Sequence, residues 1–148
     1  MSLADHFTPD CVRFLSGSNK AETIEELLNR LAERYALDNR DEVAAAIRRR
    51  EELMSTGIGL GIAVPHVRLA SIPRPMVAVG IHHTGVTDYE SLDGKPVHVI
   101  VMILAGQGQH AAYIQLLAEI TRVLKNDKTR EKVLASVDCD EVHALLVG

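Results

Sequence analysis

The sequence predicts a single α/β domain over residues 1–148, with a mixed central β-sheet flanked by helices on both sides. One observation is that residues 97–104 are almost continuously apolar, which is typical of a strand buried on both faces at the centre of a sheet. Another is that short apolar segments alternate with longer segments whose apolar residues recur at helical spacing. No internal repeat, low-complexity segment or linker divides the chain.

The first half of the chain predicts one strand and two helices. Residues 12–15 are expected to form a strand that ends in the Ser-Gly-Ser turn at 16–18. A helix over 20–36 follows, because apolar residues recur at helical spacing at Ile24, Leu27, Leu28 and Leu31. Asp38 and Asn39 give an N-cap signal for a helix over 41–53. Its apolar stripe is expected to contain Val43, Ile47 and Met54, with Arg50 on the same face.

The second half supplies most of the predicted sheet. Residues 62–65, 76–82 and 97–104 are expected to be strands, with turns at 73–75 and 92–95. A helix over 109–124 is expected after the glycine-containing segment 105–108, and it is apolar over a wide arc. Two shorter helices over 128–135 and 140–146 are expected to complete the chain.

Composition excludes several classes of function. The formal net charge is −4 and aromatic residues make up 3% of the chain, so nucleic acid is not expected as a partner. The two cysteines, Cys11 and Cys139, are too few and too far apart for a disulfide scaffold. No apolar run could span a bilayer and no signal-peptide pattern is present, so a cytoplasmic protein without membrane insertion is expected. The oligomeric state is left open.

Residues 55–66, Ser-Thr-Gly-Ile-Gly-Leu-Gly-Ile-Ala-Val-Pro-His, are the most informative segment. A loop with three alternating glycines is expected to pass into a short strand that ends at His66, beside a backbone open enough to admit an anion. Ser55 and Thr56 add hydroxyl groups, and a neutral imidazole is nucleophilic. Phosphoryl transfer onto His66 is the simplest chemistry that uses all of them. The alternative is a tight glycine-rich connection with an incidental histidine.

Known nucleotide-binding loops do not explain this segment. The P-loop pattern is absent because no lysine follows any of the glycines. The dinucleotide fingerprint should follow a strand and open a helix, whereas here a predicted helix precedes the glycines and a predicted strand follows them. Nucleotide binding is therefore disfavoured, and no cofactor is expected.

The segment resembles the signature of enzyme IIA domains of the fructose/mannitol class of the bacterial phosphoenolpyruvate:sugar phosphotransferase system, which includes nitrogen-regulatory paralogues. The resemblance rests on Arg50-Glu51, residues 55–59, residues 61–63 and Pro65-His66, and it extends over essentially the whole chain. It implies the type-2 enzyme IIA fold, with His66 as the phosphorylated histidine. Arg50 would be the arginine beside the site, with Ser55, Thr56 and Gly59 supporting the phosphoryl group. Arg50 has a second interpretation. It would be a cation at the C-terminus of the predicted helix that interacts with the helix dipole and with the last backbone carbonyls.

The chain departs from the family pattern at two places near this site. Members usually carry a second histidine at the start of the late helix, and the matching position here is Tyr113. A tyrosine hydroxyl can hydrogen-bond a phosphoryl oxygen, but it brings no positive charge near neutral pH. His110 lies one helical turn earlier and either substitutes for that histidine or faces solvent. Val67 stands where many members have glycine.

The resemblance implies a phosphohistidine carrier. His66 would accept a phosphoryl group from an HPr-like phosphocarrier protein and pass it to a sugar-specific IIB component. The alternative is a regulatory protein whose His66 phosphorylation state controls binding to target proteins. A metal-dependent hydrolase built from His82, His83 and His98 is a weaker reading, because no compact metal-ligand spacing is present and no metal is expected.

Overall fold

The computed structural model describes residues 2–148. Its sheet runs in the order β1-β5-β6-β3-β2, and β4 pairs with β6 as well. The strands are β1 (Val12–Phe14), β2 (Gly57–Gly59), β3 (Ile62–Ala63), β4 (His66–Arg68), β5 (Met76–Val86) and β6 (Val97–Ala105). The helices are α1 (Lys20–Tyr35), α2 (Arg40–Leu53), α3 (His110–Lys125), α4 (Asp127–Ala135) and α5 (Cys139–Val147), preceded by 3-10 turns at Leu3–Asp5 and Pro9–Cys11.

The sheet is mixed, as predicted. β5 and β6 are antiparallel, whereas β1 runs parallel to β5, and both β3 and β4 run parallel to β6. The side chains of β6 from Val99 to Ala105 are all buried, which confirms β6 as the central strand.

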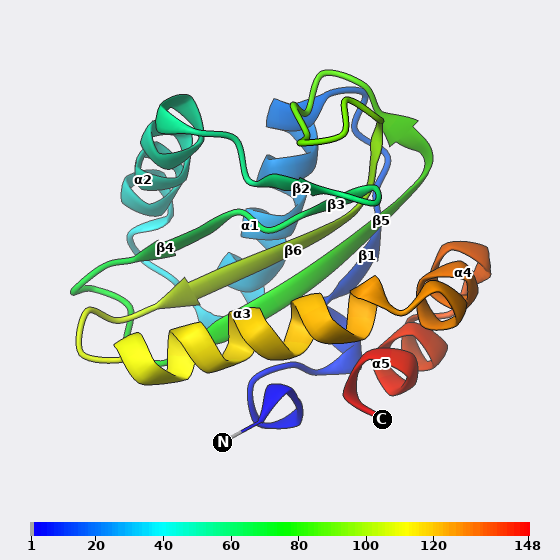
Figure 1. The fold of residues 1–148 in the computed structure, drawn as a ribbon. Helices are drawn as coiled ribbons and strands as arrows, with labels where there is room; N and C mark the ends of the chain where they lie inside the picture. The colour runs from blue at the N-terminus through cyan, green and yellow to red at the C-terminus, as the bar shows by residue number, and fades with distance from the viewer. Residues whose placement is uncertain (1) are drawn as a thin grey trace.

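Helices cover both faces of the sheet. α1 and α2 lie on one face, whereas α3, α4 and α5 lie on the other (Figure 1). α1 packs on β5 and α2 on β4, while α3 packs on β6 and α5 on β1. The α1 stripe buries Leu27, Leu28 and Leu31 completely, so its helical periodicity is confirmed. None of the helices in residues 2–148 is long and apolar enough to cross a membrane.

The stripe predicted for α2 is correct at Val43 and Ile47 but wrong at Met54. Val43 and Ile47 are buried, whereas Met54 is 70% exposed. The reason is local geometry, because α2 ends at Leu53 and Met54 has an extended backbone with φ of −165°. Helical spacing therefore no longer applies at Met54.

The glycine segment is not a loop, and His66 does not end a strand. Gly57–Gly59 forms β2, which pairs antiparallel with β3, and His66 is the first residue of β4. The predicted strand over 62–65 is interrupted after Ala63, because the amide of Val64 bonds to the Thr56 carbonyl at 3.1 Å and proline has no N–H. Pairing with β6 resumes at His66.

β5 is also longer than predicted, since it extends to Val86 rather than to His82. An irregular register between Ile81 and Val86 accommodates the extra residues. His82 lies in this stretch with its ring buried, and the next residue, His83, is exposed. The two imidazoles point to opposite faces, as strand geometry predicts.

Candidate functional site

His66 stands where β4 begins, beside Ile103 of the central strand. Its Nδ1 atom lies 2.6 Å from the carbonyl oxygen of Val64. A carbonyl can only accept, so Nδ1 carries the proton and donates it, which leaves Nε2 with the free lone pair in the neutral ring. The half-buried imidazole is thus held in one tautomer, with Nε2 as its nucleophilic atom.

The surroundings of His66 favour its neutral form. Burial lowers the pKa of the His66 imidazole, and the nearby positive charge of Arg50 adds to this effect. The hydrogen bond to Val64 and the negative charge of Glu51 act in the opposite direction, but the pKa is lowered on balance. His66 is therefore uncharged and able to attack an electrophile at neutral pH.

A cavity of about 370 Å³ opens beside His66. It lies between the last turns of α2, strand β4 and the first turn of α3. The side chains that line it are Ala46, Arg49, Arg50, Leu53, His66, Val67, Arg68, Leu69 and Tyr113. Three guanidinium groups thus share one cavity with one imidazole, and no carboxylate lines it. Such a cavity favours an anion.

Arg50 occupies the position that the sequence predicts, next to His66. Its Nη1 atom donates a hydrogen bond of 2.8 Å to the carbonyl oxygen of Met54. The guanidinium therefore binds a backbone carbonyl at the C-terminus of α2, which is a common role for a cation there, and it also lines the His66 cavity. The two interpretations of Arg50 are compatible, because a guanidinium has five donors and this bond uses one of them.

Tyr113 and His66 lie together although 47 positions in the chain separate them. The two ring centroids are 5.3 Å apart and the planes are tilted by 54°. Tyr113 is 8% exposed and forms part of the buried face of α3. The structure thus brings Tyr113, the residue that the sequence resemblance matches to a second histidine, beside His66.

Arg49 and Arg68 line the cavity and were missed by sequence reasoning. Arg49 precedes Arg50 in α2, but helical spacing alone does not assign an exposed residue near a helix end to a cavity. Arg68 is two residues after His66 in β4, and side chains two apart in a strand share a face. That alternation would have identified Arg68 if a strand had been predicted to begin at His66, where the sequence instead predicted a strand to end.

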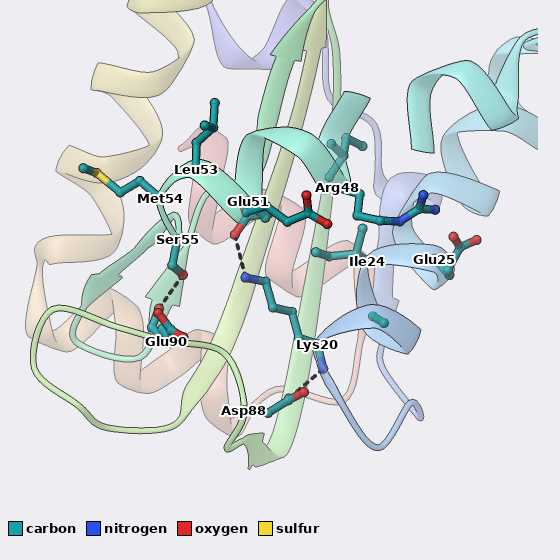
Figure 2. A pocket seen from close by; sticks show the side chains of 13 residues that line it. Lys20, Ile24, Glu25, Arg48, Glu51, Leu53, Met54, Ser55, Asp88 and Glu90 are labelled. Atoms are coloured by element: carbon teal, nitrogen blue, oxygen red, sulfur yellow. Dashed lines mark hydrogen bonds and ion pairs between the residues drawn. The ribbon is translucent and has the colours of Figure 1, made fainter. Parts of the chain in front are cut away.

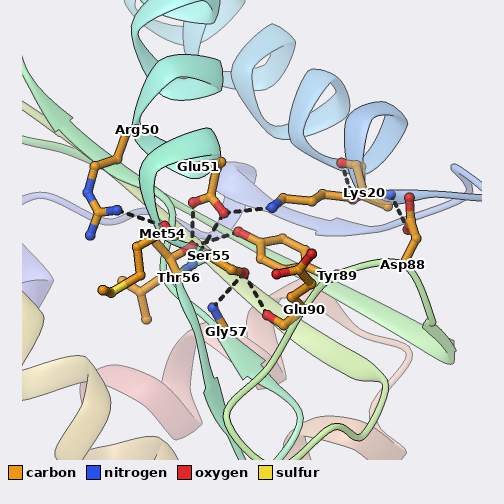
Figure 3. Close-up of polar contacts among 12 residues, drawn as sticks. Lys20, Arg50, Glu51, Met54, Ser55, Thr56, Gly57, Asp88, Tyr89 and Glu90 are labelled. Carbon is orange, nitrogen blue, oxygen red and sulfur yellow. Dashed lines mark hydrogen bonds and ion pairs between the residues drawn. The ribbon is translucent and has the colours of Figure 1, made fainter.

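Ser55 and Thr56 do not line the His66 cavity. The Ser55 hydroxyl donates to the Glu90 carbonyl at 2.6 Å, and the buried Thr56 hydroxyl donates to the Glu51 carboxylate at 2.5 Å (Figure 3). The Thr56 hydroxyl also lies 2.7 Å from the Tyr89 hydroxyl. Both side chains connect the end of α2 to the loop that follows β5, so their hydroxyls are already bonded within the protein.

The three glycines shape a hairpin, and they do not leave the backbone open. Gly59 and Gly61 have φ of 96° and 74°, which L-residues rarely adopt. Gly57 packs so closely on the neighbouring loop that a Cβ atom would meet the Glu90 carbonyl oxygen at 2.2 Å. The Gly59 amide donates to the Ser91 hydroxyl at 3.0 Å. The segment is thus held against the loop that follows β5 and does not present an open backbone.

The remaining candidate, His110, is exposed at the first residue of α3 and does not line the cavity. It lies on the solvent-facing side of the helix, which agrees with the second of its two interpretations.

The other histidines named in the metal hypothesis are bonded to the backbone. His82 Nε2 lies 2.8 Å from the Gly17 carbonyl, and His98 Nδ1 lies 2.9 Å from the His82 carbonyl. Within residues 2–148, no three His, Cys, Asp or Glu side chains gather closely enough to hold a metal ion.

A second cavity of about 520 Å³ lies on the other side of α2's last turn (Figure 2). Its wall includes Lys20, whose Nζ atom is 2.9 Å from the Glu51 carboxylate. The Lys20 ammonium also lies 4.4 Å from the centroid of the Tyr89 ring. Leu53 lines both cavities, so one helix end separates them.

Comparisons of the sequence with known proteins agree with this geometry. The family model for the phosphoenolpyruvate-dependent sugar phosphotransferase system, EIIA 2, matches residues 5–147. The chain is 33% identical over 143 residues to the PTS system fructose-specific EIIABC component of Bacillus subtilis, and it covers 22% of that longer relative. It is 29% identical over 147 residues to a nitrogen regulatory protein of Bradyrhizobium diazoefficiens and covers 95% of it.

The fold is shared with solved structures as well. The crystal structure of the nitrogen regulatory protein IIA-Ntr from Neisseria meningitidis superposes with a TM-score of 0.89 at 24% sequence identity. The match covers 97% of this chain and 98% of that one. The sequence motif, the family model and the fold agree, and the chain belongs to the EIIA 2 family of the phosphoenolpyruvate-dependent sugar phosphotransferase system.

Proposed function

We propose that this protein is a cytoplasmic phosphohistidine carrier in which Nε2 of His66 accepts a phosphoryl group from an HPr-like phosphocarrier protein. The observation that carries the proposal is the neutral His66 ring, whose Nδ1 is bonded to Val64 and which shares a cavity with three arginines. A lone pair and a cluster of guanidinium groups are what acceptance of a phosphoryl group requires.

Phosphoryl transfer to Nε2 of His66 needs no general base, because no proton has to be removed from the attacking nitrogen. The lone pair of His66 Nε2 forms a bond to phosphorus while the phosphorus–nitrogen bond of the donor phosphohistidine breaks. The donor imidazole leaves with that electron pair and is neutral if its other nitrogen already carries a proton. His66 keeps its own proton on Nδ1, where the Val64 carbonyl stabilises the positive charge that develops in the ring. Catalysis is then mainly positioning and charge stabilisation.

The relatives suggest two uses of the phosphoryl group on His66. The name of the B. subtilis relative joins an A component to B and C components, which favours onward transfer to a IIB component. The Bradyrhizobium relative is a nitrogen regulatory protein that matches this chain nearly end to end. It favours the alternative, in which the charge added at His66 changes binding to a target protein.

Labelling experiments test the acceptor residue. Wild-type protein incubated with radiolabelled phosphoenolpyruvate, enzyme I and HPr should acquire acid-labile phosphate. The His66→Ala variant should acquire none, whereas His83→Ala, which removes an exposed imidazole on β5, should be labelled normally. Absence of label on wild-type protein would contradict the proposal.

The destination is tested with the labelled protein. Transfer of the label to an added IIB component supports the carrier function. Retention of the label, together with capture of a target by only one phosphorylation state, supports the regulatory alternative.

A further inference from the structure

Arg68 is one of two uncommitted cations of the His66 cavity, Arg49 being the other, and of these two Arg68 is the one that lies over the Tyr113 ring. Arg50 already donates to the Met54 carbonyl, but Arg68 makes no hydrogen bond or ion pair to any residue between 2 and 148. Its side chain is exposed and lines the cavity. A guanidinium without a protein partner, directed into a cavity that holds a nucleophile, is available to an anionic ligand.

Strand geometry places Arg68 on the same side of the sheet as His66. Val67 lies between them and is 8% exposed, so its side chain points into the core. His66 and Arg68 therefore both point away from it, and their Cα atoms are separated by about 6.6 Å along a strand. That separation is within reach of an arginine side chain from a group attached to the imidazole.

Tyr113 limits where the Arg68 guanidinium lies. The central carbon of that guanidinium is 5.6 Å from the centroid of the Tyr113 ring, and the His66 ring is 5.3 Å from the same centroid. Arginine commonly stacks on aromatic faces in this way, which reduces the freedom that an exposed side chain must lose on binding. One aromatic ring thus lies against both the acceptor imidazole and the Arg68 guanidinium.

We propose that Arg68, positioned on the Tyr113 ring, binds the oxygens of the phosphoryl group carried by His66. The inference rests on the proposed function, because it assigns a further residue to that same site. While the phosphorus is transferred to Nε2, Arg68 keeps all its protons and neutralises charge on the transferring oxygens. After transfer it holds the product dianion, and Tyr113 acts as a positioning residue.

The test uses two donors, phosphorylated HPr and the small donor phosphoramidate, on the full chain. Arg68→Gln should accept phosphate about tenfold more slowly than wild type from both donors, the loss expected for one charge-assisted hydrogen bond. Arg48→Gln is the matched control, because it makes the same change of net charge on an exposed side chain that lines the other cavity. Arg68→Lys should recover part of the rate, since it keeps the charge but loses the two-pronged geometry.

A spectroscopic readout separates binding from folding. A cation beside the phosphoryl group favours its dianion, so the pKa read from the phosphorus NMR signal of phosphorylated His66 should rise in Arg68→Gln and stay unchanged in Arg48→Gln. Tyr113→Leu should raise that pKa as well, whereas Tyr113→Phe, which keeps the ring, should not.

The possible outcomes are distinct. If Arg68→Gln matches Arg48→Gln in both rate and phosphorus titration, the inference is overturned. If Arg68→Gln is slow with HPr alone and its titration is normal, Arg68 contacts the partner protein instead, and the inference is again overturned. If phosphoramidate labels His66 but HPr does not, the proposed carrier function fails, and the small donor still tests Arg68.

Discussion

At the scale of single residues, the chemistry of the site depends on opposing effects at one imidazole. Burial and the charge of Arg50 disfavour protonation of His66, while the Val64 carbonyl fixes the proton that the neutral ring retains. The same carbonyl can stabilise the cationic ring that forms when phosphorus is attached to Nε2. A histidine on an open surface would have neither a fixed tautomer nor this lowered pKa.

His66 should therefore titrate below the usual pKa of 6.5. The unfolded chain binds a proton at His66 more readily than the folded chain, so this group destabilises the fold as the pH falls from 6.5 through the folded pKa. Above pH 6.5 it makes no difference to stability. Proton and nitrogen NMR of the His66 ring measures the midpoint directly. Arg50→Gln should raise it, and a wild-type midpoint at or above 6.5 would contradict the argument.

At the scale of elements, the last turn of α2 serves two sites. Arg50 and Glu51 leave this turn on different sides (Figure 3). Arg50 lines the His66 cavity, whereas the buried Glu51 carboxylate accepts from the Thr56 hydroxyl and pairs with Lys20. The Glu51 contacts join α1, α2 and the start of β2, so they determine where the helix end that carries Arg50 lies.

Replacing Glu51 should weaken the whole domain. Glu51→Ala leaves the Thr56 hydroxyl and the Lys20 ammonium without a carboxylate, and loss of one partner of a buried ion pair costs about 3 kcal/mol in free energy of unfolding. Glu52→Ala removes an exposed carboxylate one residue later and should cost less than about 0.5 kcal/mol. Urea unfolding measures the free energy of unfolding of the two variants. Equal stabilities would show that the Glu51 contacts contribute little.

The β2–β3 hairpin leads into His66 and packs closely on the loop that follows β5. Gly57→Ala would place a methyl group against the backbone carbonyl of Glu90, where only 2.2 Å is available. We expect a loss of at least about 2 kcal/mol in unfolding free energy, because a backbone atom must move. Gly108→Ala is the matched control, since its added Cβ meets nothing within 4 Å. Thermal unfolding should show a lower midpoint for Gly57→Ala than for the control.

At the scale of the whole molecule, the site is assembled from segments that are distant in the sequence. β4 brings His66 and Arg68, α2 brings Arg49 and Arg50, and α3 brings Tyr113. Tyr113 belongs to the first turn of α3. The N-terminal end of this helix lies beside the C-terminal ends of β4 and β6 (Figure 1). The central strand β6 connects them, because β4 pairs with it and α3 packs on it.

A cavity in the central strand should therefore weaken the whole fold. Ile100 is completely buried in β6, and Ile100→Ala should lower the free energy of unfolding by about 2–5 kcal/mol. Val137→Ala, at a side chain that is 82% exposed, should change it by less than about 0.5 kcal/mol. Chemical denaturation measures both. A small effect of Ile100→Ala would mean that the core relaxes around the cavity.

Much of the architecture could be predicted, because periodicity and burial are local properties of a sequence. The helices α1, α2 and α3 and the central strand β6 lie within a residue or two of the expected ranges. The errors are concentrated between Met54 and Arg68, where short strands, glycines and a proline make periodicity uninformative. There the backbone follows its pairing with β6 and with the loop after β5, which are contacts between distant segments.

The sequence by itself determined the family and indicated His66, Arg50 and Tyr113 as neighbours, since a long motif of fixed spacing carries that information. It could not show that Ser55, Thr56 and the glycines bond within the protein, or that Arg68 faces the same cavity as His66. Those facts depend on which face each strand residue presents and on which distant carbonyls satisfy each donor. Only the tertiary structure decides them, because hydrogen-bond partners and cavities form between segments that the sequence keeps far apart.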